Sequence, residues 1–230
     1  MQQVIPLLPF DYATESVDHV SRHRACGGTW CQWRLSHSCA MGIDELIKQT
    51  AEGQRVKYLH FWGHTARGDG TIGASCLSQW WPSPFDVDGV RYETAEHWMM
   101  ASKARLFGDA EAERVALAAR TPAEAKKAGR LVRGFDDAVW KRERFGVVRS
   151  GSVHKFGQDA SLCDFLLATG DRVLVEASPM DRIWGIGLAA DDERAQDPAR
   201  WRGLNLLGFA LMEAREELRG PDQRVTSTTR

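Results

Sequence analysis

The sequence predicts a compact, mainly helical single domain of the α+β class with a small β-sheet. Helical segments outnumber short segments of strand character, and the strands lie at both ends of the helical block instead of alternating with helices. A doubly wound α/β fold would require that alternation. The 230 residues are enough for one domain with a sizeable core, and no internal repeat or long linker divides them.

The charge balance is close to neutral, with 30 Lys and Arg against 31 Asp and Glu and a net charge of -1. A general nucleic-acid binder would carry a clear positive excess, so any such contact should be local. Because the chain has no run of about 18 apolar residues and no signal-peptide pattern, we expect a cytoplasmic protein without a membrane partner. Five unevenly spaced cysteines favour reduced thiols over a disulfide framework.

Residues 1–40 are predicted to be an N-terminal extension without regular periodicity. Three histidines and three cysteines lie close together there, but their spacings match no common zinc motif, so we predict no metal site. Alternatively, Met41, which begins a helical segment with Asp44 in its first turn, is the true start. The globular domain is expected to span 41–220, followed by a disordered tail at 221–230.

Strand signals follow the first predicted helix. The apolar and aromatic run at 56–63 predicts a buried strand, and 76–81 predicts a second short strand after a polar, glycine-rich loop. Residues 85–92 alternate around Asp88-Gly89, the signal for a tight β-hairpin.

The helix predicted from Thr94, a suitable N-cap, to Gly108 carries charges on an apolar face. Glu96 and Lys103 are two turns apart and therefore share one side with apolar residues. Periodicity allows two interpretations: a solvated edge of an amphipathic helix, or a carboxylate and an ammonium group held at a pocket for proton transfer or nucleophilic attack.

Beyond this helix the chain is predicted to be largely helical until a last strand. The segment Thr121-Pro122-Ala123-Glu124 combines an N-cap, a proline at the first helical position and a capping-box acid. Further helices are predicted at 136–156, 162–170 and 206–218, and a strand at 172–177.

The loop after that strand places Asp181 three residues before Trp184 and next to Gly185. An acid and an indole on a glycine-flanked loop after a buried strand are typical of a ligand-facing turn. Several of the nine tryptophans lie beside glycine, proline or charge, as in a pocket that stacks on flat rings, although each one alone could be a core residue.

Successive blocks of the sequence resemble the NADAR family in order and in spacing. They run from about Tyr58 to Leu218 and include LSQWWPSPFDVDGVRYETAEHWMMASKARLFGD, TPAEAKKAGR, FDDAVWKRER, HKFGQD, LLATGDRVLVEASPMDRIWGIGL and WRGLNLLGFALMEAREEL. The resemblance implies an α+β hydrolase that breaks an N-glycosidic bond at C1 of a ribose. One branch of the family acts on reactive pyrimidine intermediates of riboflavin synthesis, and another removes ADP-ribose from guanine.

The resemblance also implies that Glu96 and Lys103 are active-site residues and that Asp181 and Trp184 line the pocket. We predict that Asp181 or Glu96 stabilises a cationic C1 and activates water. Lys103 would protonate the leaving nitrogen or form a Schiff base with the opened ribose. The predicted substrate contacts are stacking by Trp98 and Trp184, a contact at Gly185, and phosphate binding by Arg105, Arg142, Arg149 or Lys155.

The expected substrate is a small phosphoribosylamino pyrimidine, and the expected reaction needs neither cofactor nor metal. Removal of ADP-ribose from guanine in nucleic acid is one alternative, and a non-catalytic module that recognises NAD or ADP-ribose is another. The set Glu96, Lys103 and Asp181 favours an enzyme, because binding alone needs no such ionisable groups. The nearly neutral charge favours a small-molecule substrate over DNA.

Overall fold

Seven α-helices and two small sheets make up residues 41–220, the part of the chain that the computed structural model describes. This confirms the predicted mainly helical α+β class. The predicted N-terminal extension, with its histidines and its cysteines at 26, 31 and 39, lies outside the described residues, as does the predicted disordered tail. Within residues 41–220, no helix is both long enough and apolar enough to cross a membrane.

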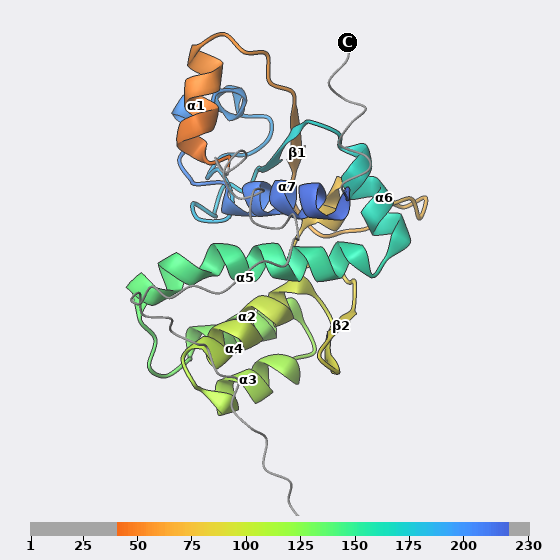
Figure 1. Cartoon of the computed structure of the whole chain (residues 1–230), viewed down its shortest axis with the longest axis vertical. Coiled ribbons are helices and arrows are strands. Elements are labelled where there is room, and N and C mark those ends of the chain that lie inside the picture. Colours follow the sequence, from red (N-terminus) through yellow and green to blue (C-terminus); the bar gives the residue numbers. More distant parts are fainter. Residues whose placement is uncertain (1–40, 221–230) are drawn as a thin grey trace, which may run out of the picture. The chain divides into compact units, whose positions relative to one another are not determined.

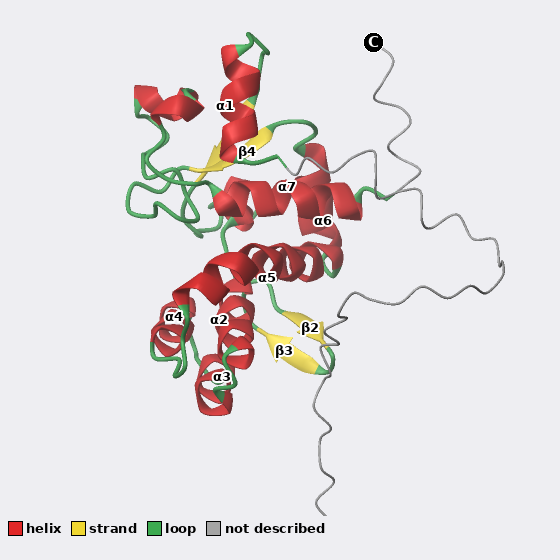
Figure 2. Ribbon diagram, turned by 60° about the vertical axis from the view of Figure 1, so that its left-hand side comes forward, coloured by secondary structure: helices red, strands yellow, loops and turns green. Residues whose placement is uncertain are grey.

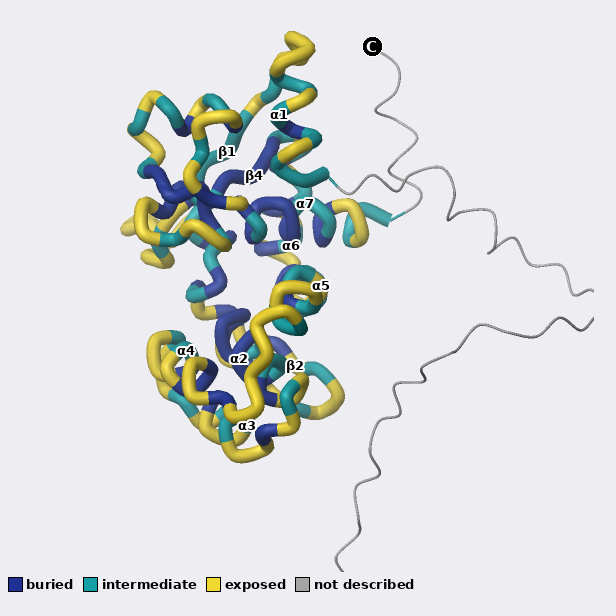
Figure 3. Tube along the Cα trace, turned by 90° about the vertical axis from the view of Figure 1, so that its left-hand side faces the viewer, coloured by how far each residue is buried: buried dark blue, intermediate teal, exposed yellow. Residues whose placement is uncertain are grey.

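The long helix α5 (Asp137–Gly157) lies between the two halves of the domain (Figure 1). On one side it packs against α7 and α6, and on the other side against α2, which also packs against α3 and α4. The bounds of these helices are α2 Ala95–Leu106, α3 Ala110–Leu117, α4 Pro122–Arg130, α6 Ala160–Ala168 and α7 Leu206–Leu218. The tube in Figure 3 is mostly buried along β4 and α7, whereas α3 and α4 alternate between exposed and more buried residues.

Strands β1 (Tyr58–Phe61) and β4 (Val173–Glu176) form a parallel pair in which Phe61 is opposite Glu176. β4 is buried on both faces. Leu174 belongs to the core cluster shared with α2, α5 and α7, whereas Val173 and Val175 pack in a second cluster that includes Leu46 of α1 (Ile43–Ala51) and Phe209 of α7. Because the two strands are parallel, their carboxyl ends lie at the same edge of the sheet.

Helix α7 approaches β4 closely because residue 208 is glycine. A Cβ atom at Gly208 would lie 2.0 Å from the Leu174 carbonyl oxygen, a distance that no side chain can occupy. The buried side chain of Asn205 fills the adjacent position, where its Oδ1 accepts from the Glu176 amide at 2.9 Å and its Nδ2 donates to the Leu174 carbonyl at 2.9 Å. The Asn205 amide thus pairs with the free edge of β4 as a neighbouring strand would.

The predicted hairpin is confirmed as β2 (Phe85–Val87) and β3 (Val90–Tyr92), which lie beside α2 (Figure 2). Its two turn residues, Asp88 and Gly89, have φ angles of 52° and 77°, as a tight turn between right-twisted strands requires. Phe85 and Tyr92 are opposite each other in the ladder, and their stacked rings, 5.7 Å apart, both contact the ring of Trp98 in α2.

The strand predicted at 76–81 is wrong. These residues belong instead to the 3₁₀ turn η1 (Ala74–Leu77) and the turn that follows it. An apolar run can be buried without a strand partner if its carbonyl groups are bonded elsewhere. Lys155 provides those bonds, because its Nζ donates to the Cys76 oxygen at 2.6 Å and to the Ser78 oxygen at 2.8 Å.

The two predicted N-caps, Thr94 and Thr121, are confirmed. Thr94 accepts from the His97 amide at the start of α2, and Thr121 accepts from the Glu124 amide at the start of α4. Asp136 and Asp159 cap α5 and α6 in the same way. Each side chain bonds one of the amides that the first helical turn leaves without a partner, which sets where each helix begins.

Candidate active site

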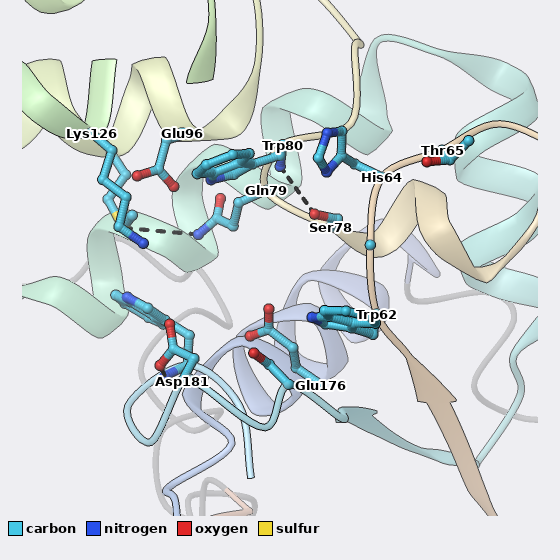
Figure 4. Close-up of a pocket in the computed structure, with 14 residues that line it drawn as sticks. Trp62, His64, Thr65, Ser78, Gln79, Trp80, Glu96, Lys126, Glu176 and Asp181 are labelled. Carbon is cyan, nitrogen blue, oxygen red and sulfur yellow. Dashed lines mark hydrogen bonds between the residues drawn. The ribbon is translucent and has the colours of Figure 1, made fainter. Parts of the chain in front are cut away.

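A cavity of about 460 Å³ lies where the carboxyl ends of β1 and β4 face helices α2 and α4 (Figure 4). Ligands of parallel sheets commonly bind at these strand ends. The lining residues come from the loop after β1, the turn after η1, α2, α4, and the end of β4 with its following loop; they are Trp62, Gly63, His64, Thr65, Ser78, Gln79, Trp80, Glu96, Met99, Lys126, Glu176, Ser178, Asp181 and Trp184.

Glu96 brings a carboxyl group to the cavity from the first turn of α2. The residue is 2% exposed, its Oε1 has no hydrogen-bond partner, and its amide donates to the Gln79 oxygen at 3.0 Å. Burial raises the pKa of Glu96 to about 7, although the positive charge of Lys126 and the Trp80 side chain oppose the rise. Near neutral pH this group can therefore both accept and release a proton.

Glu176, the last residue of β4, brings a second carboxyl group to the cavity. Its backbone is held on both sides: its amide donates to Asn205, and its carbonyl oxygen accepts from the Ile186 amide at 2.9 Å. Its Oε2 is enclosed and has no hydrogen-bond partner. Burial raises the pKa of Glu176 to about 8, and the nearby carboxylates of Asp181 and Glu96 contribute to the rise.

Asp181 and Trp184 reach the cavity from the loop after β4. The Asp181 Oδ1 accepts from the amides of Ile183 at 2.8 Å and of Trp184 at 2.7 Å, which fixes the orientation of its carboxylate in an Asx-type turn. Figure 4 shows Asp181 and Glu176 on one side of the cavity, with Glu96 and Lys126 on the other. Glu96, Asp181 and Trp184 are thus the predicted site residues that the fold brings together.

Gly185 follows Trp184 in the same loop and does not line the cavity. A Cβ atom there would be 2.7 Å from the Glu176 oxygen and 3.1 Å from the Asp181 oxygen. Glycine at position 185 therefore allows the loop to pack closely against the end of β4.

Replacing Gly185 with Ala should push Asp181 away from Glu176 and lower the free energy of unfolding by ~1–3 kcal/mol, the usual cost of overpacking. Urea denaturation measures this change. The matched control is Gly146→Ala in α5, where a Cβ atom meets nothing within 4 Å and Ala should be neutral or slightly stabilising. Equal stability of the two variants would contradict the close packing described here.

Lys103 does not line the cavity. Its Nζ donates to the Gly129 oxygen at 2.8 Å and lies 4.2 Å from the centre of the Phe135 ring. Lys103 and Glu96 do share one side of α2, but two helical turns separate them by about 10 Å along the axis. The ammonium group therefore reaches the end of α4, and its partial burial lowers its pKa.

Trp98 and Lys155 also lie outside the cavity, in the packing that supports it. The Trp98 indole donates to the Val147 oxygen at 2.8 Å, and its ring contacts that of Tyr92 with centroids 5.1 Å apart. Lys155 is 1% exposed, and burial lowers its pKa to about 7. Because it holds the carbonyls of Cys76 and Ser78, Lys155 positions the turn that carries Gln79 and Trp80 to the cavity.

The arginines predicted to hold phosphate are paired with acids elsewhere on the surface. Arg142 donates to Glu143, Arg149 pairs with Glu213 and Glu217, and Arg105 pairs with Glu113. Within residues 41–220, the cavity lining contains no arginine.

Lys126 of α4 supplies the positive charge in the lining, and sequence reasoning missed it together with Glu176. The Lys126 Nζ lies 5.8 Å from the centre of the Trp80 ring. Trp62, which also lines the cavity, is 65% exposed. One signal was available for Glu176: a single acid ends an otherwise apolar run that predicts a buried strand.

Among the described residues, no group of three or more His, Cys, Asp or Glu is arranged to hold a metal ion. Cys76 and Cys163, the two cysteines in this part of the chain, are free thiols.

The buried carboxyls should make the domain less stable as pH rises. Glu96 and Glu176 have folded-state pKa values of about 7 and about 8 against an ordinary value of 4.5. The folded state therefore keeps protons that the unfolded chain releases, so the free energy of unfolding falls between about pH 4.5 and pH 8. Glu176→Gln should be more stable than the wild type by ~1–3 kcal/mol above pH 8 and equal to it near pH 5, as urea titrations at both pH values would measure. A difference that does not depend on pH would contradict the assignment.

An α+β domain whose strand ends carry a carboxylate-rich cavity lined by indole rings is suited to a hydrolase that acts on a flat, ring-bearing compound. Residues 60–219 match the family model of the NADAR domain, and the chain belongs to this family of N-glycosidases. The resemblance seen in the sequence blocks is thereby confirmed.

The chain is similar to two N-glycosidases, and the structure of one of them is known. An N-glycosidase of Acanthamoeba polyphaga mimivirus is 39% identical over 166 residues, which cover 70% of this chain and 96% of that protein. N-glycosidase YbiA of Escherichia coli is 33% identical over 135 residues, 59% of this chain and 76% of YbiA. The NMR structure of Escherichia coli YbiA matches the fold with a TM-score of 0.55 at 27% sequence identity, covering 71% of this chain and 87% of that one.

Proposed function

We propose that this protein, a hydrolase acting on N-glycosyl bonds, cleaves the C1–N bond of a phosphoribosylamino pyrimidine intermediate of riboflavin synthesis and releases ribose 5-phosphate. The observation that carries the proposal is the convergence of three carboxyl groups, those of Glu96, Glu176 and Asp181, on a cavity that is also lined by indole rings. Two relatives, from Vibrio vulnificus at 32% identity and Zea mays at 32% identity, are named riboflavin biosynthesis proteins, which supports this substrate class.

Cleavage of a ribosyl C–N bond passes through a cationic, oxocarbenium-like C1. Negative charge at a fixed position lowers the energy of such a centre, most of all in a site that excludes water. The Asp181 carboxylate, held by two backbone amides, and the buried Glu96 carboxyl can provide this charge and accept a proton from the attacking water. The reaction then needs only side chains of the cavity.

The remaining substrate contacts follow from the other lining residues. Trp80 and Trp184 offer flat faces for the pyrimidine ring. Lys126 is the candidate for the phosphate, because it carries the positive charge of the lining. The contacts of Lys103 with Gly129 and Phe135 give no support to the predicted Schiff base, and borohydride trapping of substrate carbon on Lys103 would restore that mechanism.

The test is to incubate the purified protein with phosphoribosylamino pyrimidines and to follow free ribose 5-phosphate by mass spectrometry. Asp181→Ala should abolish release. Glu143→Gln, which changes a carboxylate on the outer surface of α5, should leave it unchanged. If the wild type releases nothing, ADP-ribosylated guanine in a DNA strand is the next substrate, and release of ADP-ribose would favour the nucleic-acid branch. Binding of ADP-ribose without any release would favour a non-catalytic module.

A further inference from the structure

The proposed reaction needs a proton donor for the leaving nitrogen, because an arylamine anion is a poor leaving group. Lys103, predicted from the sequence as that donor, directs its ammonium group to the Gly129 oxygen instead of the cavity. The cavity lining also contains Lys126, which is assigned to the phosphate in the proposed function, and the exposed His64. The donor is therefore sought among the three carboxyl groups of the lining.

The surroundings of the three carboxyls differ. Glu96 lies with the Trp80 indole and Lys126 in the cavity lining, and both favour its charged form. Asp181 accepts two backbone amides at one oxygen and so presents a fixed acceptor.

Glu176 has the opposite environment. Its Oε2 is enclosed without a hydrogen-bond partner, and it shares its side of the cavity with Asp181 (Figure 4). Of the charged groups around it, Asp181 and Glu96 favour its neutral form, whereas Lys126 opposes them. Burial and these charges raise the pKa of Glu176 to about 8, so it carries a proton at neutral pH.

Its position suits proton donation as well. The backbone of Glu176 is fixed by Asn205 on one side and Ile186 on the other, so the carboxyl group enters the cavity from a rigid strand end. Catalytic groups held in this way lose little free energy to reorganisation.

We propose that Glu176 is the general acid that protonates the leaving nitrogen as the C1–N bond breaks. The electron pair of that bond passes to nitrogen, which takes the Glu176 proton and leaves as the aminopyrimidine. A water oxygen bonds to C1, and its proton passes to the Asp181 or Glu96 carboxylate and returns to Glu176 through solvent. The inference rests on the proposed function, and it assigns to Glu176 one step of that reaction.

The experiment compares two leaving groups on ribose 5-phosphate, the aminopyrimidine and 4-nitrophenolate, which needs no protonation to depart. In Glu176→Gln, kcat/KM should fall by about 100-fold or more for the aminopyrimidine and by less than about fivefold for the nitrophenyl compound. Equal losses on both substrates would overturn the general-acid role while leaving the proposed function intact. A wild type that does not cleave the aminopyrimidine would instead overturn the proposed function itself, and the role of Glu176 with it.

A second measurement does not depend on cleavage. Carboxyl ¹³C NMR of the glutamate-labelled wild type, with the Glu176 signal assigned by its absence in Glu176→Gln, reports the protonation of this group directly. A Glu176 that stays protonated at pH 7 supports the proposal, whereas one that is already ionised at pH 6 overturns it. Gln matches the shape of the protonated acid, so the variant should fold, and Glu143→Gln serves as the matched surface control.

Discussion

Replacing Glu96 with Gln should lower kcat for release of ribose 5-phosphate by about 1,000-fold, the usual effect of removing a group that stabilises transition-state charge. The side chain is almost fully buried at the cavity. Solvent therefore cannot replace the stabilisation that its negative charge gives to the cationic C1. KM should change little, because the lost interaction strengthens only in the transition state. Initial rates measured by mass spectrometry would check both values.

Glu93→Gln is the matched control for this variant. Glu93 lies just before α2, three residues from Glu96, but its side chain is 58% exposed and contacts Arg91. The control should retain wild-type activity and stability. If Glu96→Gln kept more than a tenth of the wild-type kcat, the charge at C1 would have to come from Asp181, and the role assigned to Glu96 would be wrong.

Replacing Asn205 with Ala should lower the free energy of unfolding by ~3 kcal/mol, because two buried backbone groups of β4 lose their partners. The Glu176 amide and the Leu174 carbonyl both bond to the Asn205 side chain, which is 0% exposed. Asn205 also has a φ of 53°, a conformation that costs Ala more than Asn. Thermal unfolding should show the melting temperature falling by ~6–12 °C.

Asn205→Gly separates the two causes. Glycine adopts the positive φ angle freely but cannot bond β4, so it should recover only the backbone part of the loss, about 1 kcal/mol. Full recovery in the glycine variant would show that the hydrogen bonds to β4 contribute nothing. Since these bonds also fix the end of the strand that carries Glu176, activity should fall in both variants even at temperatures where they remain folded.

The starts of helices and the hairpin turn could be predicted from the sequence because the bonds and backbone angles that set them involve residues close together in the chain. The caps Thr94 and Thr121 act on amides within three residues, and Asp88-Gly89 sets the hairpin through its own φ angles. The loop residues Asp181 and Trp184 were found for a similar reason, since an acid and an indole after a buried strand stay near the strand end wherever the strand is placed. Glu96 was found because it is a charge on an apolar helix face.

Contacts between distant segments could not be predicted in this way. The run at 76–81 forms a turn instead of a strand because Lys155, far along the chain, bonds its carbonyls. Lys103 shares a helix face with Glu96, as the periodicity indicates, yet α4 and Phe135 place its ammonium group outside the cavity. Periodicity gives the direction in which a side chain leaves its helix, but the neighbouring elements decide what it meets.

The sequence by itself therefore determined most of the helices, the hairpin, the mainly helical α+β class and three residues of the candidate site. Only the tertiary structure decided that β1 pairs with β4, across more than a hundred residues, and that Glu176 and Lys126 join Glu96 and Asp181 around one cavity. The physical reason is that helix caps and turns are set by bonds within a few residues. The acidity of Glu176 instead depends on burial and on charges that come from separate elements and meet only when the chain is folded.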